Sequence, residues 1–151
     1  MKTNADMRQL LEGLGSAPKC NEALYSLLSG GLSRVEQAWV FSEFSQRAKE
    51  APAGIQSSPA ELEWWTNELY IGDYLSDAAG GSTLFREGYA AVVALVQVLR
   101  KNQHLDGAQV ILSVDVDSEY PSAVVRFYIP RRRRRNAELQ PGSIRFGSTG
   151  N

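Results

Sequence analysis

The chain has 151 residues, of which 43% are hydrophobic and 22% are charged. This length suits one domain with a single core, and the composition is too apolar for a disordered protein. The net charge of −1 hides two regions of opposite sign. Residues 1–130 carry 10 Lys and Arg against 16 Asp and Glu, a charge of −6, whereas residues 131–151 carry 6 against 1, a charge of +5.

A cytoplasmic location is expected. No uncharged apolar run reaches the roughly 18 residues that a membrane span requires, and the N-terminal segment has no apolar core of the kind found in signal peptides. The single cysteine, Cys20, has no partner for an internal disulfide, which fits a reducing compartment.

The N-terminal part of the chain predicts helices. Apolar periodicity indicates short helices at residues 4–14 and 21–29, which a turn containing glycine and proline separates. A longer helix is predicted over residues 33–50, because Ser33 and Glu36 have the spacing of a capping box and apolar residues recur on roughly one face.

Two further helices follow. Ser58 is a suitable N-cap, Pro59 suits the first helical position, and Glu61 stands three residues after the cap. These residues predict a helix whose body reaches Leu69. After a pair of glycines, a wide apolar stripe predicts a long helix over residues 82–102, with Ser82 as its cap. We expect this helix to lie at the centre of the domain.

The C-terminal part predicts strands. The apolar period changes from 3.6 to 2, which indicates strands at residues 110–116 and 123–129 that form an antiparallel hairpin. A hairpin alone is marginally stable in water, so a third strand is expected at residues 142–147. The predicted fold is one α+β domain over residues 1–147, in which a helical N-terminal half with a long central helix packs on a small antiparallel sheet. Residues 148–151 are expected to form a frayed tail.

Five consecutive arginines follow the second predicted strand: Arg131, Arg132, Arg133, Arg134 and Arg135. Three interpretations are open. The run is a strip that binds nucleic-acid phosphates, a nuclear-localisation signal, or a solvated edge whose charges discourage strand pairing and contact acidic groups. The negative charge of the rest of the chain opposes a nucleic-acid backbone, which favours the third interpretation.

An acidic segment, residues 61–77, contains no Lys or Arg and interleaves carboxylates with aromatic residues. Aromatic anchors with a carboxylate rim are typical of surfaces that bind a basic protein, although a solvated helix with aromatic side chains in the core has the same pattern. A second acidic group at the turn of the hairpin extends the segment. The candidate partner-binding residues are Glu61, Glu63, Trp64, Glu68, Asp73, Tyr74, Asp77, Asp115, Asp117 and Glu119, together with the five arginines.

Catalytic chemistry has little support in the sequence. His104 is the only histidine and lies at the polar end of the long helix, where it is better placed to contact terminal carbonyls than to act as a base. Cys20 has no Cys or His at metal-ligand spacing. Asp115 and Asp117 fit a hairpin surface better than a metal site. We therefore predict that the protein is not an enzyme and uses no cofactor and no metal.

Three stretches carry a resemblance to a known class of proteins: Leu69-Tyr-Ile-Gly-Asp-Tyr-Leu, Glu87-Gly-Tyr-Ala-Ala-Val-Val-Ala-Leu-Val and Val114-Asp-Val-Asp-Ser-Glu-Tyr-Pro. In this layout, which covers about residues 62–130, the chain resembles the immunity proteins of bacterial polymorphic toxins, such as those of contact-dependent inhibition. The resemblance implies a cytosolic, non-catalytic protein that binds a cognate toxin domain. Immunity proteins differ widely in their binding surfaces, so the resemblance identifies no individual binding residue.

The expected function is therefore that of a non-enzymatic protein-binding protein, an immunity protein that neutralises a toxin domain. The alternative is a nucleic-acid-binding protein that uses Arg131–Arg135 as a phosphate clamp. The arginine run departs from what neutralising a basic nuclease requires, because it would repel a basic toxin surface unless it lay elsewhere or met an acidic patch.

Overall fold

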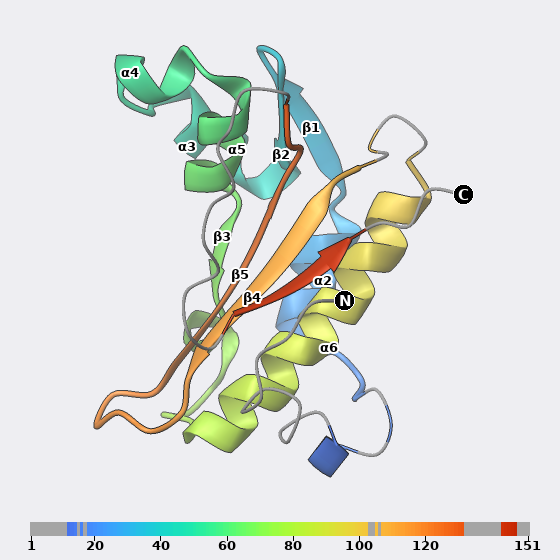
Figure 1. The fold of residues 1–151 in the computed structure, drawn as a ribbon, viewed down its shortest axis with the longest axis vertical. Helices are drawn as coiled ribbons and strands as arrows, with labels where there is room; N and C mark the ends of the chain where they lie inside the picture. The colour runs from blue at the N-terminus through green and yellow to red at the C-terminus, as the bar shows by residue number, and fades with distance from the viewer. Residues whose placement is uncertain are drawn as a thin grey trace.

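The computed structural model describes residues 12–14, 16, 18–102, 105 and 107–131, together with the backbone of residues 143–147. A four-stranded sheet carries two helices on one face, and a two-stranded sheet with three short helices lies at one end of it (Figure 1). The helices are α2 (Glu22–Ser29), α3 (Ser45–Lys49), α4 (Ala53–Gln56), α5 (Pro59–Thr66) and α6 (Gly81–Arg100), with 3-10 turns η1 (Ser42–Phe44) and η2 (Ile71–Tyr74). The strands are β1 (Leu32–Val35), β2 (Ala38–Phe41), β3 (Glu68–Tyr70), β4 (Gln109–Asp115), β5 (Ser122–Tyr128) and β6 (Ser143–Gly147).

The larger sheet has the strand order β3-β5-β4-β6, and each neighbouring pair is antiparallel. β4 and β5 form the predicted hairpin, in which Val110 lies opposite Phe127 and Leu112 lies opposite Val125. These side chains are at most 1% exposed, because they point toward the helices. β6 pairs with the other edge of β4, which confirms the third strand predicted at residues 142–147.

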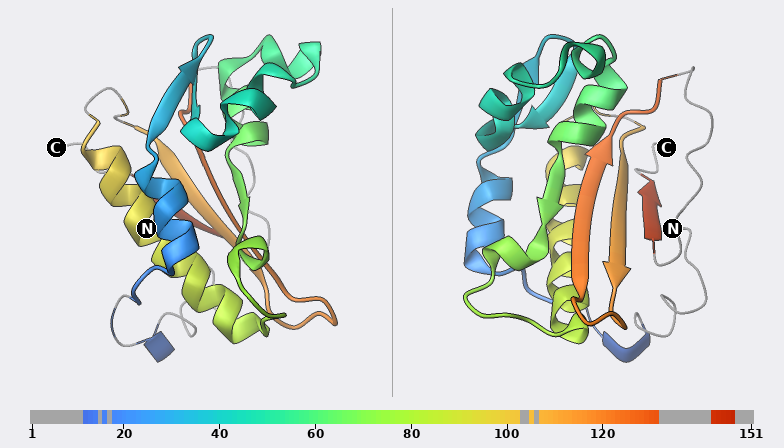
Figure 2. Two further views of the ribbon diagram at one scale, coloured as in Figure 1. Left: turned by 180° about the vertical axis from the view of Figure 1, so that it is seen from behind. Right: turned by 90° about the vertical axis from the view of Figure 1, so that its left-hand side faces the viewer.

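The long helix α6 crosses one face of this sheet and packs on β4 and β5, with α2 beside it (Figure 2). Its apolar stripe faces the strands, as the sequence predicted. Gly88 permits the close approach, because a Cβ at this position would stand 2.8 Å from Cδ1 of Leu112. The helix begins at Gly81, so Gly80 holds the cap position and makes no side-chain hydrogen bond. The predicted cap at Ser82 is therefore wrong, because Ser82 lies inside the helix.

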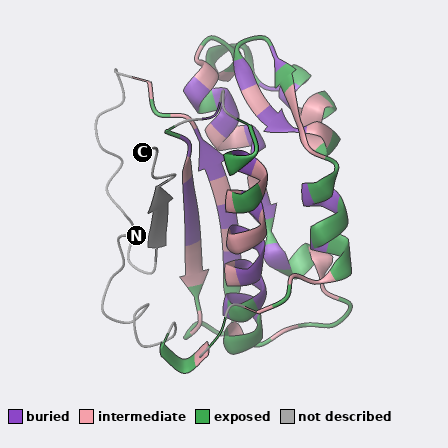
Figure 3. Cartoon of the chain, turned by 90° about the vertical axis from the view of Figure 1, so that its right-hand side faces the viewer, coloured by how far each residue is buried: buried purple, intermediate pink, exposed green. Residues whose placement is uncertain are grey.

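Buried side chains form two clusters (Figure 3). The larger cluster lies between the four-stranded sheet, α2 and α6, and the smaller one lies between β1, β2, α3 and α5. Among the described residues, α6 is long and apolar enough to cross a membrane, with a mean hydropathy of 1.2. Half of it is buried inside the fold, which is consistent with the core helix of a soluble protein.

The starts of α2 and α5 are both capped by a side chain, and the cap predicted at Ser58 is confirmed. The side chain of Asn21 accepts a hydrogen bond from the backbone N–H of Leu24 at the start of α2. Ser58 caps α5 in the same way by accepting from the N–H of Glu61, with Pro59 as the first helical residue. The helix predicted at residues 4–14 lies outside the described residues except for 12–14, which are helical.

The helix predicted over residues 33–50 is wrong for most of its length, because β1 and β2 form a hairpin there. Ser33 does not cap a helix, since its hydroxyl bonds to the hydroxyl of Ser42 across the hairpin at 2.7 Å. Glu36 sits in the turn with a φ of 52°, a conformation that ends any helical path. Only η1 and α3 at the end of the segment are helical, so the N-terminal half is only partly helical.

The predicted continuation of α5 to Leu69 is also wrong. The helix ends at Thr66, and residues 68–70 form β3 on the edge of the larger sheet. Leu69 is nevertheless fully buried, because it lies opposite Val125 on β5. The apolar spacing therefore identified a core position but not the element that carries it.

Candidate functional site

Glu63, a candidate partner-binding residue, is buried inside the protein. Its carboxylate is 0% exposed, and each of its oxygens lies 3.0 Å from a guanidinium nitrogen of Arg131. Arg131 also donates to the backbone carbonyls of Gln37 and Ile129. This burial contradicts the prediction that Glu63 belongs to an exposed recognition surface. Arg131, the first arginine of the proposed phosphate clamp, already binds a carboxylate of the same chain. The other four, Arg132, Arg133, Arg134 and Arg135, lie outside the described residues.

Two side chains, one on α5 and one directly after it, join the edges of the two sheets. Glu63 accepts hydrogen bonds from the backbone N–H groups of Trp39 on β2 and Ile129 after β5, at 2.9 and 2.8 Å. Asn67, just after the helix, accepts from the N–H of Phe41 at 3.1 Å and donates to the carbonyl of Trp39 at 2.8 Å. These bonds satisfy backbone groups that a neighbouring strand would otherwise pair. Glu63 and Asn67 are therefore structural residues.

The two tryptophans of α5 pack against arginines of the same chain. The guanidinium carbon of Arg47 lies 4.9 Å from the ring centroid of Trp65, and that of Arg126 lies 5.2 Å from the ring of Trp64. Glu68 forms ion pairs with both arginines. Burial lowers the pKa of Arg126. Trp64 and Glu68, two candidate partner-binding residues, thus belong to an internal network.

Other candidate carboxylates gather at the end of the molecule where α6 begins. Gly81, the first residue of α6, lies so close to the β4–β5 turn that a Cβ on it would stand 2.7 Å from the Cα of Val116. This contact holds the segment between η2 and α6 next to the turn. Both lie at the same end of the larger sheet (Figures 1 and 2).

We call this region the acidic end and define it by five exposed carboxylates: Asp73, Asp77, Asp115, Asp117 and Glu119. The structure therefore brings together the two acidic groups that the sequence predicted separately. Residues 50–85 and 102–125 contain no Lys or Arg. The first basic residue of α6, Arg86, lies 3.4 Å from the carboxylate of Glu87.

Two exposed tyrosines belong to the elements that form this end. Tyr70, the last residue of β3, is 47% exposed, and Tyr120 in the β4–β5 turn is 80% exposed. Neither was a candidate binding residue, although the interleaving of aromatic and acidic residues that marked the segment also includes Tyr70. Tyr74 is half-buried against the core, and burial followed by the charges of Glu43 and Asp73 raises its pKa. Glu61 lies at the start of α5, away from the acidic end.

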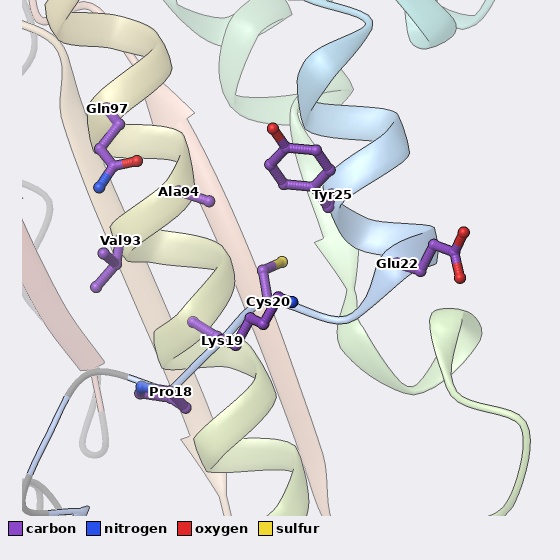
Figure 4. A pocket seen from close by; sticks show the side chains of 9 residues that line it. Pro18, Lys19, Cys20, Glu22, Tyr25, Val93, Ala94 and Gln97 are labelled. Atoms are coloured by element: carbon purple, nitrogen blue, oxygen red, sulfur yellow. The ribbon is translucent and has the colours of Figure 1, made fainter.

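A groove runs between α2 and α6 (Figure 4). Its wider part has a volume of about 630 Å³, and a second hollow of about 370 Å³ continues it toward the end of α6. Tyr25, Ala94 and Gln97 line both parts. Cys20 lines the wider part, where burial, followed by the charge of Glu87, raises the pKa of its thiol to about 11. The cysteine is therefore a protonated thiol at neutral pH.

Within the part of the chain that the structure describes, no three His, Cys, Asp or Glu side chains come together in a way that could hold a metal ion. Asp115 and Asp117 are exposed near the tip of the hairpin, and the backbone N–H of Ser118 bonds to the carboxylate of Asp115 at 3.3 Å. His104 lies outside the described residues.

Comparison with protein families identifies the family of the chain. The model of the Uncharacterized protein PM0498 family matches residues 2–137, which is most of the chain. No curated protein and no solved structure matches the chain.

Proposed function

We propose that this chain, which belongs to the PM0498 family, binds a basic surface of a partner protein through its acidic end. We further propose that it acts in the cytoplasm as an immunity protein that neutralises a toxin domain. The observation that carries the proposal is the meeting of two acidic segments at one end of the fold, where they expose five carboxylates.

The charges of the acidic end favour a basic partner for a physical reason. At physiological salt, charges interact over a Debye length of about 8 Å, so carboxylates on neighbouring loops add their fields. Such a surface accelerates association with a basic partner and repels acidic ones. Glu63 and Glu68 pair with arginines inside the protein, so these two carboxylates contribute little to the negative potential at the surface. The acidic end is therefore the surface that would attract a basic partner.

The exposed tyrosines supply the second part of the proposal. Charge at a wet rim contributes mainly to rate and specificity, whereas aromatic side chains that become buried contribute most of the affinity of an interface. Tyr70 and Tyr120 stand on the elements that carry the acidic end and are exposed in the free protein. They take the anchoring role that the sequence suggested for Trp64 and Tyr74.

The test is co-expression with the product of the neighbouring gene, followed by purification and measurement of the affinity of the complex. One variant combines Asp73→Asn, Asp77→Asn and Asp117→Asn. The matched control combines Glu12→Gln, Glu36→Gln and Glu50→Gln, which removes three exposed carboxylates elsewhere. We expect the first variant to lose about tenfold or more in affinity and the control less than about threefold, since a fully desolvated or well-placed charge contributes far more than a remote one.

Inhibition of the toxin is measured in the same experiment. Protection of cells that express the neighbouring gene should fall with the affinity of the first variant. Failure of the wild-type protein to form a complex with that gene product would overturn the immunity role. Equal affinities for the two variants would overturn the assignment of the interface to the acidic end.

A further inference from the structure

We propose that residues 32–66 form a small lobe that opens from the rest of the molecule as one unit, with Arg131 as the latch that holds it closed. The small lobe carries β1, β2, α3, α4 and α5, and Figure 1 shows it at one end of the larger sheet. Among the described strands, none of the small lobe pairs with a strand of the larger sheet. Side chains, not a backbone ladder, therefore close the boundary between the two parts.

The small lobe has a core of its own, and that core is small. Its buried cluster has six members, of which three are alanines: Val35, Ala38, Val40, Ala48, Ala51 and Leu62. An alanine side chain buries little apolar surface, so this cluster stabilises the lobe only modestly. Units that open below the free energy of global unfolding are contiguous motifs with few buried apolar contacts. The small lobe has both properties.

The chain enters and leaves the small lobe at positions suited to a hinge. At the entry, Gly31 has a φ of 78°, and a Cβ added to it would find nothing within 4 Å. Glycine adopts this backbone conformation at no steric cost. At the exit, Asn67 ends the helical path of α5 with a ψ of 45°. Hinges are formed by a few residues at the ends of elements, as these two are.

Two aromatic contacts hold the small lobe against the sheet. Phe41 of β2 packs edge-on against Phe127 of β5, with 5.0 Å between the ring centroids. Trp64 of α5 packs in the same manner against Tyr128 of β5 at 5.3 Å. These contacts favour the closed state, so the open state is a minor one. They can separate and re-form without any strand of the larger sheet losing its partner.

Arg131 connects the boundary by charged hydrogen bonds. Two of its nitrogens donate to the carboxylate of Glu63 at 3.0 Å, and one also donates to the carbonyl of Gln37 between β1 and β2 at 2.9 Å. On the side of the sheet, it donates to the carbonyl of Ile129 at 3.3 Å. Arg131 thus binds the small lobe at two separate places from a segment that follows β5. Hydrogen bonds between charged groups are about twice as strong as neutral ones, so this side chain is the latch.

The inference does not depend on the proposed function. The small lobe and the acidic end lie at opposite ends of the larger sheet (Figure 1). A partner bound at the acidic end would therefore leave the latch untouched. Either proposal can fail without the other.

Hydrogen exchange of the full chain in increasing urea tests the inference. The amides of β1 and β2 should share one opening free energy, lower than that of the slowest amides of α6 and β4. They should also respond less steeply to urea, because opening the lobe exposes less surface than global unfolding. Arg131→Ala should raise the exchange rate of the β1 and β2 amides by at least about tenfold. Arg34→Ala, which removes an exposed arginine of β1, is the matched control and should change these rates by less than about twofold.

Gly81→Ala supplies the sharper result. It strains the contact between α6 and the β4–β5 turn, which stays in place when only the small lobe opens. The slowest amides of α6 and β4 should therefore exchange about fivefold faster or more, whereas those of β1 and β2 should change by less than about twofold. Equal acceleration of both sets would overturn the inference, because the lobe would then open only when the whole molecule unfolds. Amides of β1 and β2 that exchange no faster in Arg131→Ala than in the wild type would overturn the role of the latch.

Discussion

The replacement of Glu63 by alanine tests the role of the buried ion pair in the fold. The substitution removes the two carboxylate oxygens to which Arg131 donates and leaves the backbone N–H groups of Trp39 and Ile129 without their partner. Breaking a buried ion pair by removal of one partner costs about 3–5 kcal/mol, and each unsatisfied buried group costs about 1–3 kcal/mol. These costs overlap, and the side chain of Arg131 is 37% exposed, so we expect a total loss of about 3–5 kcal/mol.

The assay is urea unfolding followed by circular dichroism and tryptophan fluorescence. In thermal unfolding of the same variant, the expected loss lowers the melting temperature by roughly 10 °C for a domain of this size. Glu50→Ala, at an exposed position, should stay within about 0.5 kcal/mol of the wild type. A double-mutant cycle with Arg131→Ala should give a coupling energy of at least about 1 kcal/mol. A loss below about 1 kcal/mol for Glu63→Ala would refute the account of how α5 joins the two sheets.

Two further predictions concern Gly81 and Cys20. Gly81→Ala should destabilise the protein by about 1–3 kcal/mol in urea unfolding, because the new Cβ would stand 2.7 Å from the backbone of Val116; Gly54→Ala, with nothing within 4 Å, should be neutral or stabilising, and the reverse order would contradict the packing of α6 on the turn. Burial raises the pKa of the Cys20 thiol from 9.0 to about 11, so its alkylation by iodoacetamide at pH 8 should be about tenfold or more slower than that of an unperturbed thiol, because the smaller thiolate fraction outweighs the higher nucleophilicity of a more basic thiolate. The rate should rise about tenfold per pH unit up to pH 10, and a rate at pH 8 equal to that of a free thiol would contradict the burial of Cys20.

The elements that could be predicted from sequence are those whose signal is local. Ser58 and Pro59 mark the start of α5 because the capping bond and the fixed φ of proline act within one turn. The alternating residues of β4 and β5 reveal the hairpin because the strands are adjacent in the chain and one face is buried.

The missed elements depend on contacts between distant parts of the chain. The segment after Ser33 has a helical spacing, but β2 forms because Glu63 of α5 and Asn67 directly after this helix supply hydrogen bonds to its edge. No local pattern reveals these bonds. The ion pair between Glu63 and Arg131 joins residues 68 positions apart, so the sequence grouped both with surface charges.

The candidate site, too, could be predicted from the sequence only in part. The carboxylates of Asp73, Asp77, Asp115 and Asp117 were identified as two acidic groups from composition alone. Their meeting at one end depends on the approach of α6 to the β4–β5 turn, which the small size of Gly81 permits. The pair Gly80-Gly81 did not reveal that contact, because glycines are also common at ordinary helix boundaries.

The most direct test of the central claim is the salt dependence of the association rate between this protein and the product of the neighbouring gene. If the acidic end steers a basic partner, the rate should fall by about tenfold or more between 50 and 500 mM salt. The variant with Asp73→Asn, Asp77→Asn and Asp117→Asn should associate more slowly at low salt and lose most of this dependence. A wild-type rate that does not change with salt, or a variant with the same dependence as the wild type, would contradict the account.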